Sequence, residues 1–238
     1  RDLEVPDGWV GFYDSIVCWD HLLNKVWILA TGLLPDGSRS IGRARAQREA
    51  WHALLDRSGV ESWPPSDSAQ IGTVMSSLSR ESFVARVRRA LDYIRRGDIY
   101  QVNLSQRLSV RASLSAWELF LRLRKASPAP GSAYLNAGSF RIASATPELF
   151  LQMSGDQVVT CPIKGTRPRG GDGLADTRLA QELQHSPKEN AELVMITDLL
   201  RNDLGRICEF GSVRVKDLAR IETYPQVHHL VSTVEGEL

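Results

Sequence analysis

Apolar residues alternate with polar ones in some parts of the chain and recur every three or four residues in others. The clearest alternation runs from 100 to 108, where Tyr100, Val102, Leu104 and Leu108 share one face and predict a half-polar strand. Runs rich in β-branched and aromatic residues predict further strands at 9–19, 25–30, 132–135, 140–144, 147–153, 157–161, 213–215 and 227–235. Helical spacing predicts helices at 41–55, 80–96, 116–125, 174–185 and 187–201.

Capping residues support three of the helix boundaries. A serine before a helix accepts a backbone N–H, a glutamate three residues later completes a capping box, and a glycine ends the helix in the left-handed conformation. These residues are Ser79 and Gly97 around the second helix, Ser115 and Glu118 at the third, and Ser186 and Glu189 at the fifth. Between 58 and 77 the chain is rich in proline and serine, which predicts an exposed connector.

Composition excludes several classes of protein. The 238 residues carry a net charge of +1, so neither a nucleic-acid-binding surface nor an acidic tail is indicated. The three cysteines are widely spaced and odd in number, which argues against a disulfide framework and favours a reducing, cytoplasmic location. No apolar run is long enough to predict a membrane span.

A predicted hairpin brings a carboxyl group and an amine together. The strands 147–153 and 157–161 are joined by a Gly-Asp turn, and folding about Gly155 sets Glu148 opposite position 162 or 163. Lys164 then lies one or two residues past that pair. A glutamate and a lysine so placed are ordinarily a surface ion pair that contributes about 0–1 kcal/mol. The glycine that follows the lysine also allows a small molecule to approach the backbone.

Two carboxylates share one face of the helix predicted at 187–201. Glu189 and Glu192 are three residues apart, and the capping box explains Glu189 but not Glu192. Paired carboxylates suit a hard cation, and Mg²⁺ is the usual occupant where an anionic substrate completes its coordination. The pattern predicts a Mg²⁺ site at Glu192, with Glu189 nearby.

Four segments resemble the chorismate-utilising enzymes, the group that contains anthranilate synthase and the chorismate subunit of 4-amino-4-deoxychorismate synthase. The segments are Gly97–Leu104, Ser144–Glu148, Pro162–Thr166 and His228–Gly236, with a further match along Ala191–Arg206. The resemblance implies an α+β fold like that of anthranilate synthase component I, in which antiparallel sheets pack face to face with helices outside. It also implies that residues 1–238 form part of one chorismate-binding catalytic domain, with residues 79–238 as its core portion.

The resemblance assigns roles to particular residues. Lys164 occupies a position that anthranilate synthases fill with alanine, so the chain is similar to the aminodeoxychorismate form. Gln101 stands where related isochorismate and salicylate synthases have a water-activating lysine, and glutamine cannot serve as that base. His229 aligns with a substrate-facing histidine. Since adjacent strand residues point to opposite faces, at most one of His228 and His229 serves a given site.

The implied reaction is amination of chorismate at C4 to 4-amino-4-deoxychorismate, a step of 4-aminobenzoate and folate biosynthesis. Lys164 would add at C2 as the free amine while Glu148 protonates the departing hydroxyl. Backbone N–H groups of Gly165 and Thr166 would hold a carboxylate. The ammonia would come from a glutaminase (amidotransferase) subunit, and Mg²⁺ would polarise the ring. Neither nucleic acid nor membrane is an expected partner.

The resemblance covers nearly the whole chain but only the middle of such an enzyme, so we expect an internal fragment that lacks both ends. We expect this fragment to be inactive alone, with the strand at 227–235 left as an apolar edge. Two alternatives stay open. One is anthranilate synthase component I, which aminates chorismate at C2, and the other is a non-catalytic fragment.

Overall fold

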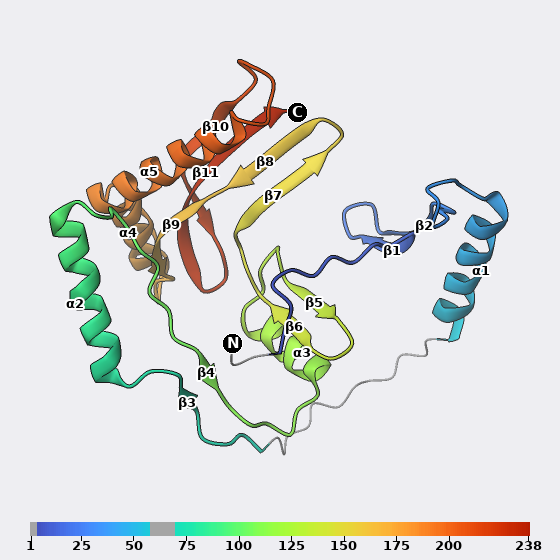
Figure 1. Cartoon of the computed structure of the whole chain (residues 1–238), viewed down its shortest axis with the longest axis horizontal. Coiled ribbons are helices and arrows are strands. Elements are labelled where there is room, and N and C mark those ends of the chain that lie inside the picture. The colour runs from blue at the N-terminus through green and yellow to red at the C-terminus, as the bar shows by residue number, and fades with distance from the viewer. Residues whose placement is uncertain (1–3, 58–69) are drawn as a thin grey trace. The chain divides into compact units, whose positions relative to one another are not determined.

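The computed structural model describes residues 4–57 and 70–238. Its contacts divide the chain into two compact units, Arg1–Asp67 and Ser68–Leu238, and each is described by itself (Figure 1). The boundary falls inside the connector predicted at 58–77. Most of that connector lies outside the described residues, and its end contains a two-residue strand, β3 (Met75–Ser76). That the whole chain is one catalytic domain stays a prediction.

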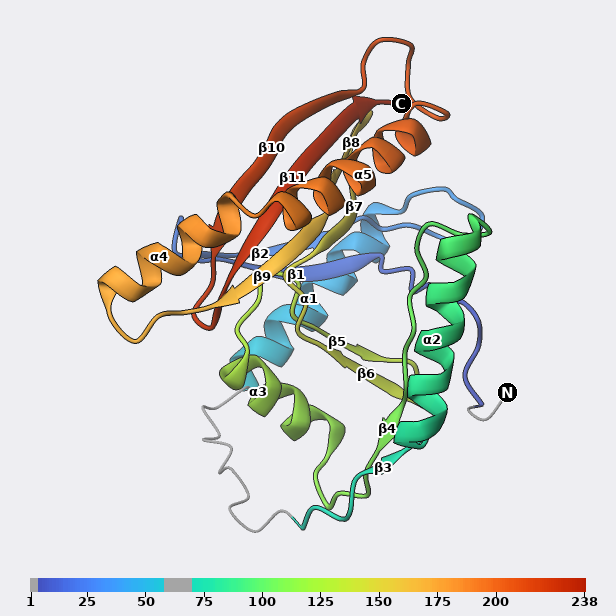
Figure 2. The ribbon, with the colours of Figure 1, turned by 90° about the vertical axis from the view of Figure 1, so that its left-hand side faces the viewer.

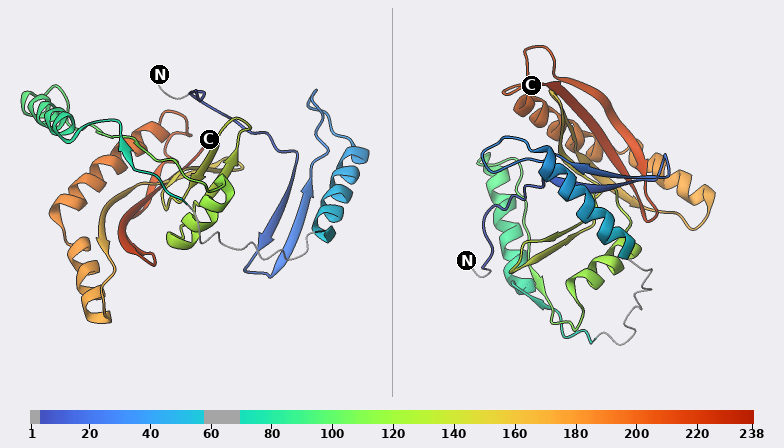
Figure 3. Two further views of the ribbon diagram at one scale, coloured as in Figure 1. Left: turned by 90° about the horizontal axis from the view of Figure 1, so that it is seen from below. Right: turned by 90° about the vertical axis from the view of Figure 1, so that its right-hand side faces the viewer.

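The first unit is a hairpin with a helix beside it (Figure 3). Strand β1 (Ser15–Asp20) pairs antiparallel with β2 (Lys25–Ala30), and helix α1 (Ile41–Arg57) follows. The helix is attached through Trp51, whose Nε1 donates to Ser15 Oγ at 3.1 Å. The strand predicted from position 9 begins only at Ser15, because the last residue of its partner, Ala30, pairs with Ser15.

A five-stranded antiparallel sheet organises the second unit. Its strands are β7 (Leu149–Ser154), β8 (Gln157–Cys161), β9 (Ile163–Pro168), β10 (Arg214–Thr223) and β11 (Val227–Glu237). Strand β11 is central, since β10 pairs with one of its edges while β8 and β9 pair in succession with the other. The expectation that 227–235 forms an open apolar edge is therefore wrong.

Helices α4 (Gly173–Gln184) and α5 (Pro187–Leu204) lie along one face of this sheet (Figure 2). Leu183 of α4, Leu193 of α5 and Leu230 of β11 pack together and are fully buried. Full burial of each such side chain stabilises the fold by about 1.5–3 kcal/mol. A second cluster joins Leu204 at the end of α5 to Val158 and Val234. Both predicted helices are confirmed.

Two further helices also begin and end close to where the capping residues predict. Helix α2 (Arg80–Arg96) has Ser79 as its N-cap and Gly97, at φ +79°, as its C-cap. Helix α3 (Ala116–Ala126) has Ser115 as its N-cap and packs against the antiparallel pair β5 (Ala133–Asn136) and β6 (Arg141–Ser144). Within the described residues, no helix has both the length and the apolar character needed to span a membrane.

The strand predicted at 100–108 is wrong. Only β4 (Leu108–Ser109) forms, paired with β3. A strand needs a neighbouring backbone to accept and donate its hydrogen bonds, and the described part of the chain offers 98–106 no partner strand. Tyr100 is consequently 68% exposed. With every ladder antiparallel and the helices outside the main sheet, the predicted α+β class is confirmed.

Candidate active site

The β7–β8 hairpin places Glu148 beside the start of β9. Gly155 makes the turn at φ +59°, and Leu149 pairs with Cys161, so Glu148 lies opposite position 162 as predicted. Its carboxylate Oε1 accepts the backbone N–H of Ile163 at 3.2 Å. The carboxylate is therefore fixed beside the points where β7 and β9 begin.

Lys164 reaches the same backbone from the next residue. Its Nζ donates to the carbonyl oxygen of Ile163 at 3.1 Å. Among the described side chains, Glu148 and Lys164 form no ion pair with each other, so each is available to a third partner. The N–H and C=O of Ile163 point to one edge of its strand. That edge faces away from β11 and has no strand partner in the described structure.

A bulge at Gly165 decides where the side chains of β9 point. Lys164 pairs with Leu230 and Thr166 with His229, so β9 contains one more residue than β11 at this step. Paired residues share a face of the sheet. Lys164 therefore lies with Leu230 on the face that α4 and α5 cover, and Thr166 lies with His229 on the opposite face. Gly165 has φ +75°, and an added Cβ would lie 2.8 Å from Leu183 Cδ1 and 3.0 Å from Glu189 Cβ. Glycine is the residue that this position tolerates.

Lys164 and Gln101 line the same cavity of about 450 Å³. The segment 98–103 forms one wall, and Ile196 and Leu199 of α5 form part of another. A neighbouring hollow of about 550 Å³ shares Tyr100 and Leu199 and extends along α5 to Arg201 and Asn202. Two residues predicted from separate motifs are thus brought together by the fold.

His229 lies at a different hollow, next to Thr166. Thr166 Oγ1 is 3.0 Å from His229 Nδ1, and His229 lines a cavity of about 220 Å³ with Pro147 and Tyr224. The adjacent His228 points to the opposite face and is buried beside α4, as the strand alternation predicts. The structure therefore does not gather Lys164 and His229 into one cavity of the described residues.

The sequence analysis missed a row of polar side chains on β10 and the turn after it. Glu222 Oε1 accepts from Arg220 Nε at 3.1 Å, and Glu222 Oε2 accepts from the Tyr224 hydroxyl at 2.7 Å. Burial and the Glu222 carboxylate raise the pKa of Tyr224 to about 12, because both favour the protonated phenol. The Tyr224 and His229 rings pack edge to face, with their centroids 5.7 Å apart. The alternation of Arg220, Glu222 and Tyr224 is the sequence signal that could have identified this row.

Glu189 and Glu192 lie in the first turns of α5 and are both half-buried. Ser186 Oγ accepts the Glu189 N–H at 3.4 Å, but the Ser186 N–H donates to Leu183 rather than to the glutamate, so only half of the capping box forms. The Glu189 carboxylate lies 3.8 Å from Arg167 Nη1. Arg167 therefore competes with a cation for Glu189 and leaves Glu192 as the freer carboxylate.

These residues partly fit a magnesium ion. The described chain contains no cluster of three acidic, histidine or cysteine side chains around one point. Mg²⁺ is commonly held by one or two carboxylates, with water and substrate oxygens completing its octahedron. Glu192 and Glu189 would supply at most that minimal protein set, and their role as ligands stays a prediction.

Fold and site together define an α+β protein whose central sheet carries a lysine on a bulged strand at the wall of a cavity. The chorismate binding enzyme family matches residues 1–238, and the chain belongs to this family. Anthranilate synthase component 1 of Thermus thermophilus is 41% identical over 237 residues, and aminodeoxychorismate synthase component 1 of Bacillus subtilis is 36% identical over 237 residues. Each alignment covers 100% of this chain and 50% of the relative. The chain thus spans about half the length of the curated relatives it matches.

Solved structures agree with this assignment. Anthranilate synthase component I from Streptococcus pneumoniae matches with a TM-score of 0.80 at 28% identity, over 95% of this chain and 49% of that one. A putative 2,3-dihydroxybenzoate-specific isochorismate synthase from Bacillus anthracis matches with a TM-score of 0.60 at 25% identity, over 71% of this chain and 46% of that one. The predicted anthranilate synthase component I-like fold is confirmed.

Proposed function

We propose that this chain is part of an enzyme that aminates chorismate at C4 to give 4-amino-4-deoxychorismate. The observation that carries the proposal is Lys164, half-buried at the wall of the cavity that Gln101 also lines. Relatives of both amination types match the chain at similar identity, so overall similarity does not choose between them. An alanine at position 164 would favour anthranilate synthase, because alanine offers no nucleophile.

Lys164 and Glu148 divide the chemistry. In the proposed reaction the Lys164 amine bonds to C2 of the ring, the double bonds shift, and the C4–O bond breaks as Glu148 protonates the leaving hydroxyl. Ammonia then bonds to C4, and the C2–N bond to the lysine breaks as the double bonds shift back. The net change exchanges hydroxyl for amine and releases water. In the structure the side chains of Glu148 and Lys164 both hydrogen-bond to the backbone of Ile163, which holds them at adjacent points of one strand edge.

Other residues would bind rather than react. Glu192, with Glu189, would hold Mg²⁺, which when bound neutralises a substrate carboxylate and polarises the ring. The backbone N–H groups of Gly165 and Thr166 would hold a carboxylate. His229, on the opposite face of the sheet from Lys164, would act through its 3.0 Å hydrogen bond to Thr166 rather than by touching a substrate bound at Lys164. Because Gln101 cannot deprotonate water, water addition is disfavoured as a competing reaction.

A glutaminase subunit is the proposed source of ammonia. At neutral pH free ammonia is mostly ammonium, which has no lone pair to attack C4. A partner that releases ammonia from glutamine would supply the reactive form. Both relatives described above are named component 1, which supports a two-component assembly.

The full-length gene product, supplied with chorismate, Mg²⁺ and ammonium at alkaline pH, tests the proposal. We expect 4-amino-4-deoxychorismate from the wild type, and Lys164→Ala should slow its formation by ~100-fold or more because the nucleophile is lost. Lys188→Ala, which removes an exposed lysine of α5, is the matched control and should retain activity. Anthranilate as the main wild-type product would overturn the C4 assignment. Unchanged turnover in Lys164→Ala would remove the lysine from the mechanism.

A further inference from the structure

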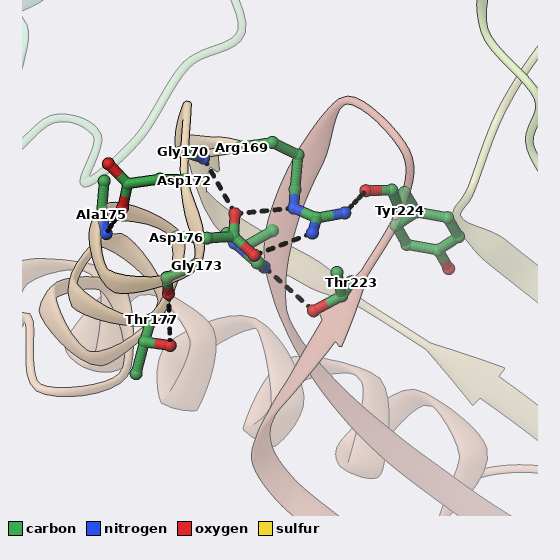
Figure 4. Close-up of polar contacts among 10 residues, drawn as sticks. Arg169, Gly170, Asp172, Gly173, Ala175, Asp176, Thr177, Thr223 and Tyr224 are labelled. Atoms are coloured by element: carbon green, nitrogen blue, oxygen red, sulfur yellow. Dashed lines mark hydrogen bonds and ion pairs between the residues drawn. The ribbon is translucent and has the colours of Figure 1, made fainter.

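Asp176, in the first turn of α4, binds two residues that directly follow β9 and one residue of β11 (Figure 4). Its Oδ1 accepts from Arg169 Nε at 2.7 Å, from the Gly170 N–H at 2.8 Å and from His228 Nε2 at 2.9 Å. Its Oδ2 accepts from Arg169 Nη2 at 2.7 Å. Four donors on one carboxylate are more than an exposed surface ion pair requires.

The donors come from two different parts of the sheet. Arg169 and Gly170 directly follow β9, whereas His228 belongs to β11 and is 3% exposed. A carboxylate can only accept, so His228 Nε2 carries the hydrogen, and its Nδ1 lies 2.9 Å from Thr223 Oγ1. The Arg169 backbone N–H also donates to the carbonyl oxygen of Gln226 at 3.1 Å. Asp176 therefore joins the end of the lysine-bearing strand to its neighbour.

This attachment bears on the bulge at Gly165. From Ile163 to Pro168 strand β9 advances five positions while β11 advances four, from Val231 to Val227. At the opposite end the Ser232 N–H donates to the Pro162 carbonyl oxygen at 3.1 Å. With both ends held, the extra residue must be accommodated between them, and Gly165 is the glycine in that stretch. A slip of one residue would transfer a strand's side chains to the opposite face.

We propose that Asp176 is a positioning residue that locks the register of β9 on β11 and so keeps Lys164 on the helix-covered face. The catalytic consequence rests on the function proposed above, in which Lys164 is the nucleophile. The structural consequence does not depend on that function. No other carboxylate of α4 is bonded to both strands in the described structure. Glu182, the other carboxylate of α4, binds Arg167 of β9 at 3.1 Å and forms no bond to β11 among the described residues.

The test compares Asp176→Asn with Glu182→Gln in the full-length enzyme, by amide hydrogen exchange and by steady-state kinetics. Asparagine keeps the size of the side chain but loses the charge and cannot accept all four bonds. We expect amides of 163–170 and 227–230 to exchange about tenfold faster or more in Asp176→Asn, with the β7–β8 hairpin unchanged. The kcat should fall by ~10-fold or more with a smaller change in KM for chorismate, because the nucleophile is displaced. Glu182→Gln should resemble the wild type.

Two outcomes would overturn the proposal. One is unchanged exchange in β9 of Asp176→Asn, and the other is a uniform increase over the whole sheet, which would indicate general destabilisation. If Asp176→Asn does not fold, Arg169→Lys keeps the charge but removes the two-pronged contact, and the same exchange pattern is expected. A wild type that forms no 4-amino-4-deoxychorismate would refute the proposed function, while the exchange measurement would still decide the role of Asp176.

Discussion

At the scale of single residues, backbone bonds govern where the proposed catalytic groups lie. The Glu148 carboxylate accepts the N–H of Ile163 at 3.2 Å, and Lys164 Nζ donates to the C=O of Ile163 at 3.1 Å. In the described structure the two side chains form no ion pair with each other. An ion pair would have to break before either group could react. Bonds to one exposed strand edge hold both groups in place and can be exchanged for bonds to a substrate.

Tyr224 should titrate late. Its pKa of about 12 lies above the ordinary value of 10, so its contribution to stability is complete below pH 10 and is lost as the pH rises toward 12. Ultraviolet absorbance during an alkaline titration should show one phenol ionising near pH 12, and Tyr224→Phe should lack that phase. Tyr134→Phe is the control and should retain it. The assignment fails if the late phase survives in Tyr224→Phe.

The two glutamates of α5 should differ in their effect on Mg²⁺. Glu192→Gln should weaken Mg²⁺ binding by ~10-fold or more, because it removes the carboxylate that Arg167 does not approach. Glu189→Gln should have a smaller effect. Calorimetric titration of the full-length protein with Mg²⁺ in the presence of chorismate measures both. Equal affinity in wild type and Glu192→Gln would refute the assignment of Glu192 as a ligand.

At the scale of elements, the bulge in β9 is the feature that shapes the site. It turns Lys164 and Thr166, which are two positions apart and would normally share a face, onto opposite faces of the sheet. The positive φ of Gly165 makes this possible, and the close approach of Leu183 and Glu189 leaves no room for a side chain. Packing of α4 and α5 therefore reinforces a conformation that the glycine permits.

Gly165→Ala should destabilise the protein more than Gly138→Ala. Both glycines have positive φ, +75° and +83° respectively, but no atom lies within 4 Å of an added Cβ at Gly138. Backbone strain costs about 1 kcal/mol at each site, and overpacking at Gly165 adds about 1–3 kcal/mol. Urea unfolding monitored by circular dichroism measures the difference. Equal losses of unfolding free energy would show that the packing at Gly165 relaxes without cost.

At the scale of the whole molecule, both units hold aspartates whose pKa values lie below the ordinary 3.8. Asp14 in the first unit is lowered by Arg43, and Asp176 in the second mainly by Arg169. A lowered pKa contributes stability that is present above the unfolded value and is lost as pH falls below it. Each unit therefore carries its own acid-sensitive contact.

Acid should weaken both units in the same pH range. We expect the urea midpoint to fall as the pH drops below about 4, since protonation of Asp14 and Asp176 breaks their bonds to arginine. In Asp176→Asn this decline should be shallower, because one of the titrating groups is absent. Measuring the midpoint from pH 6 to pH 2.5 for both proteins checks the prediction. Parallel curves would show that Asp176 contributes nothing to acid sensitivity.

The sequence by itself determined the helices, the β7–β8 hairpin and the family. Caps such as Ser79 and Ser186 act within one turn, and Gly155 acts between adjacent strands, so their effects are local and can be read from neighbouring residues. The motif around Lys164 is also contiguous. These features do not depend on where distant parts of the chain lie.

Only the tertiary structure decided which face each side chain occupies. Alternation at 100–108 predicted a strand, but only its last residue, Leu108, finds a partner strand in the described structure, and no strand forms before it. Strand 227–235 was expected at an edge and is central, because β8 and β9 share one side of it. The bulge at Gly165 depends on the pairing of Lys164 with Leu230, 66 positions further along the chain, and Asp176 bonds to His228, 52 positions further along. Such long-range pairings depend on packing and on competing partners, which the local pattern of apolar and polar residues does not contain.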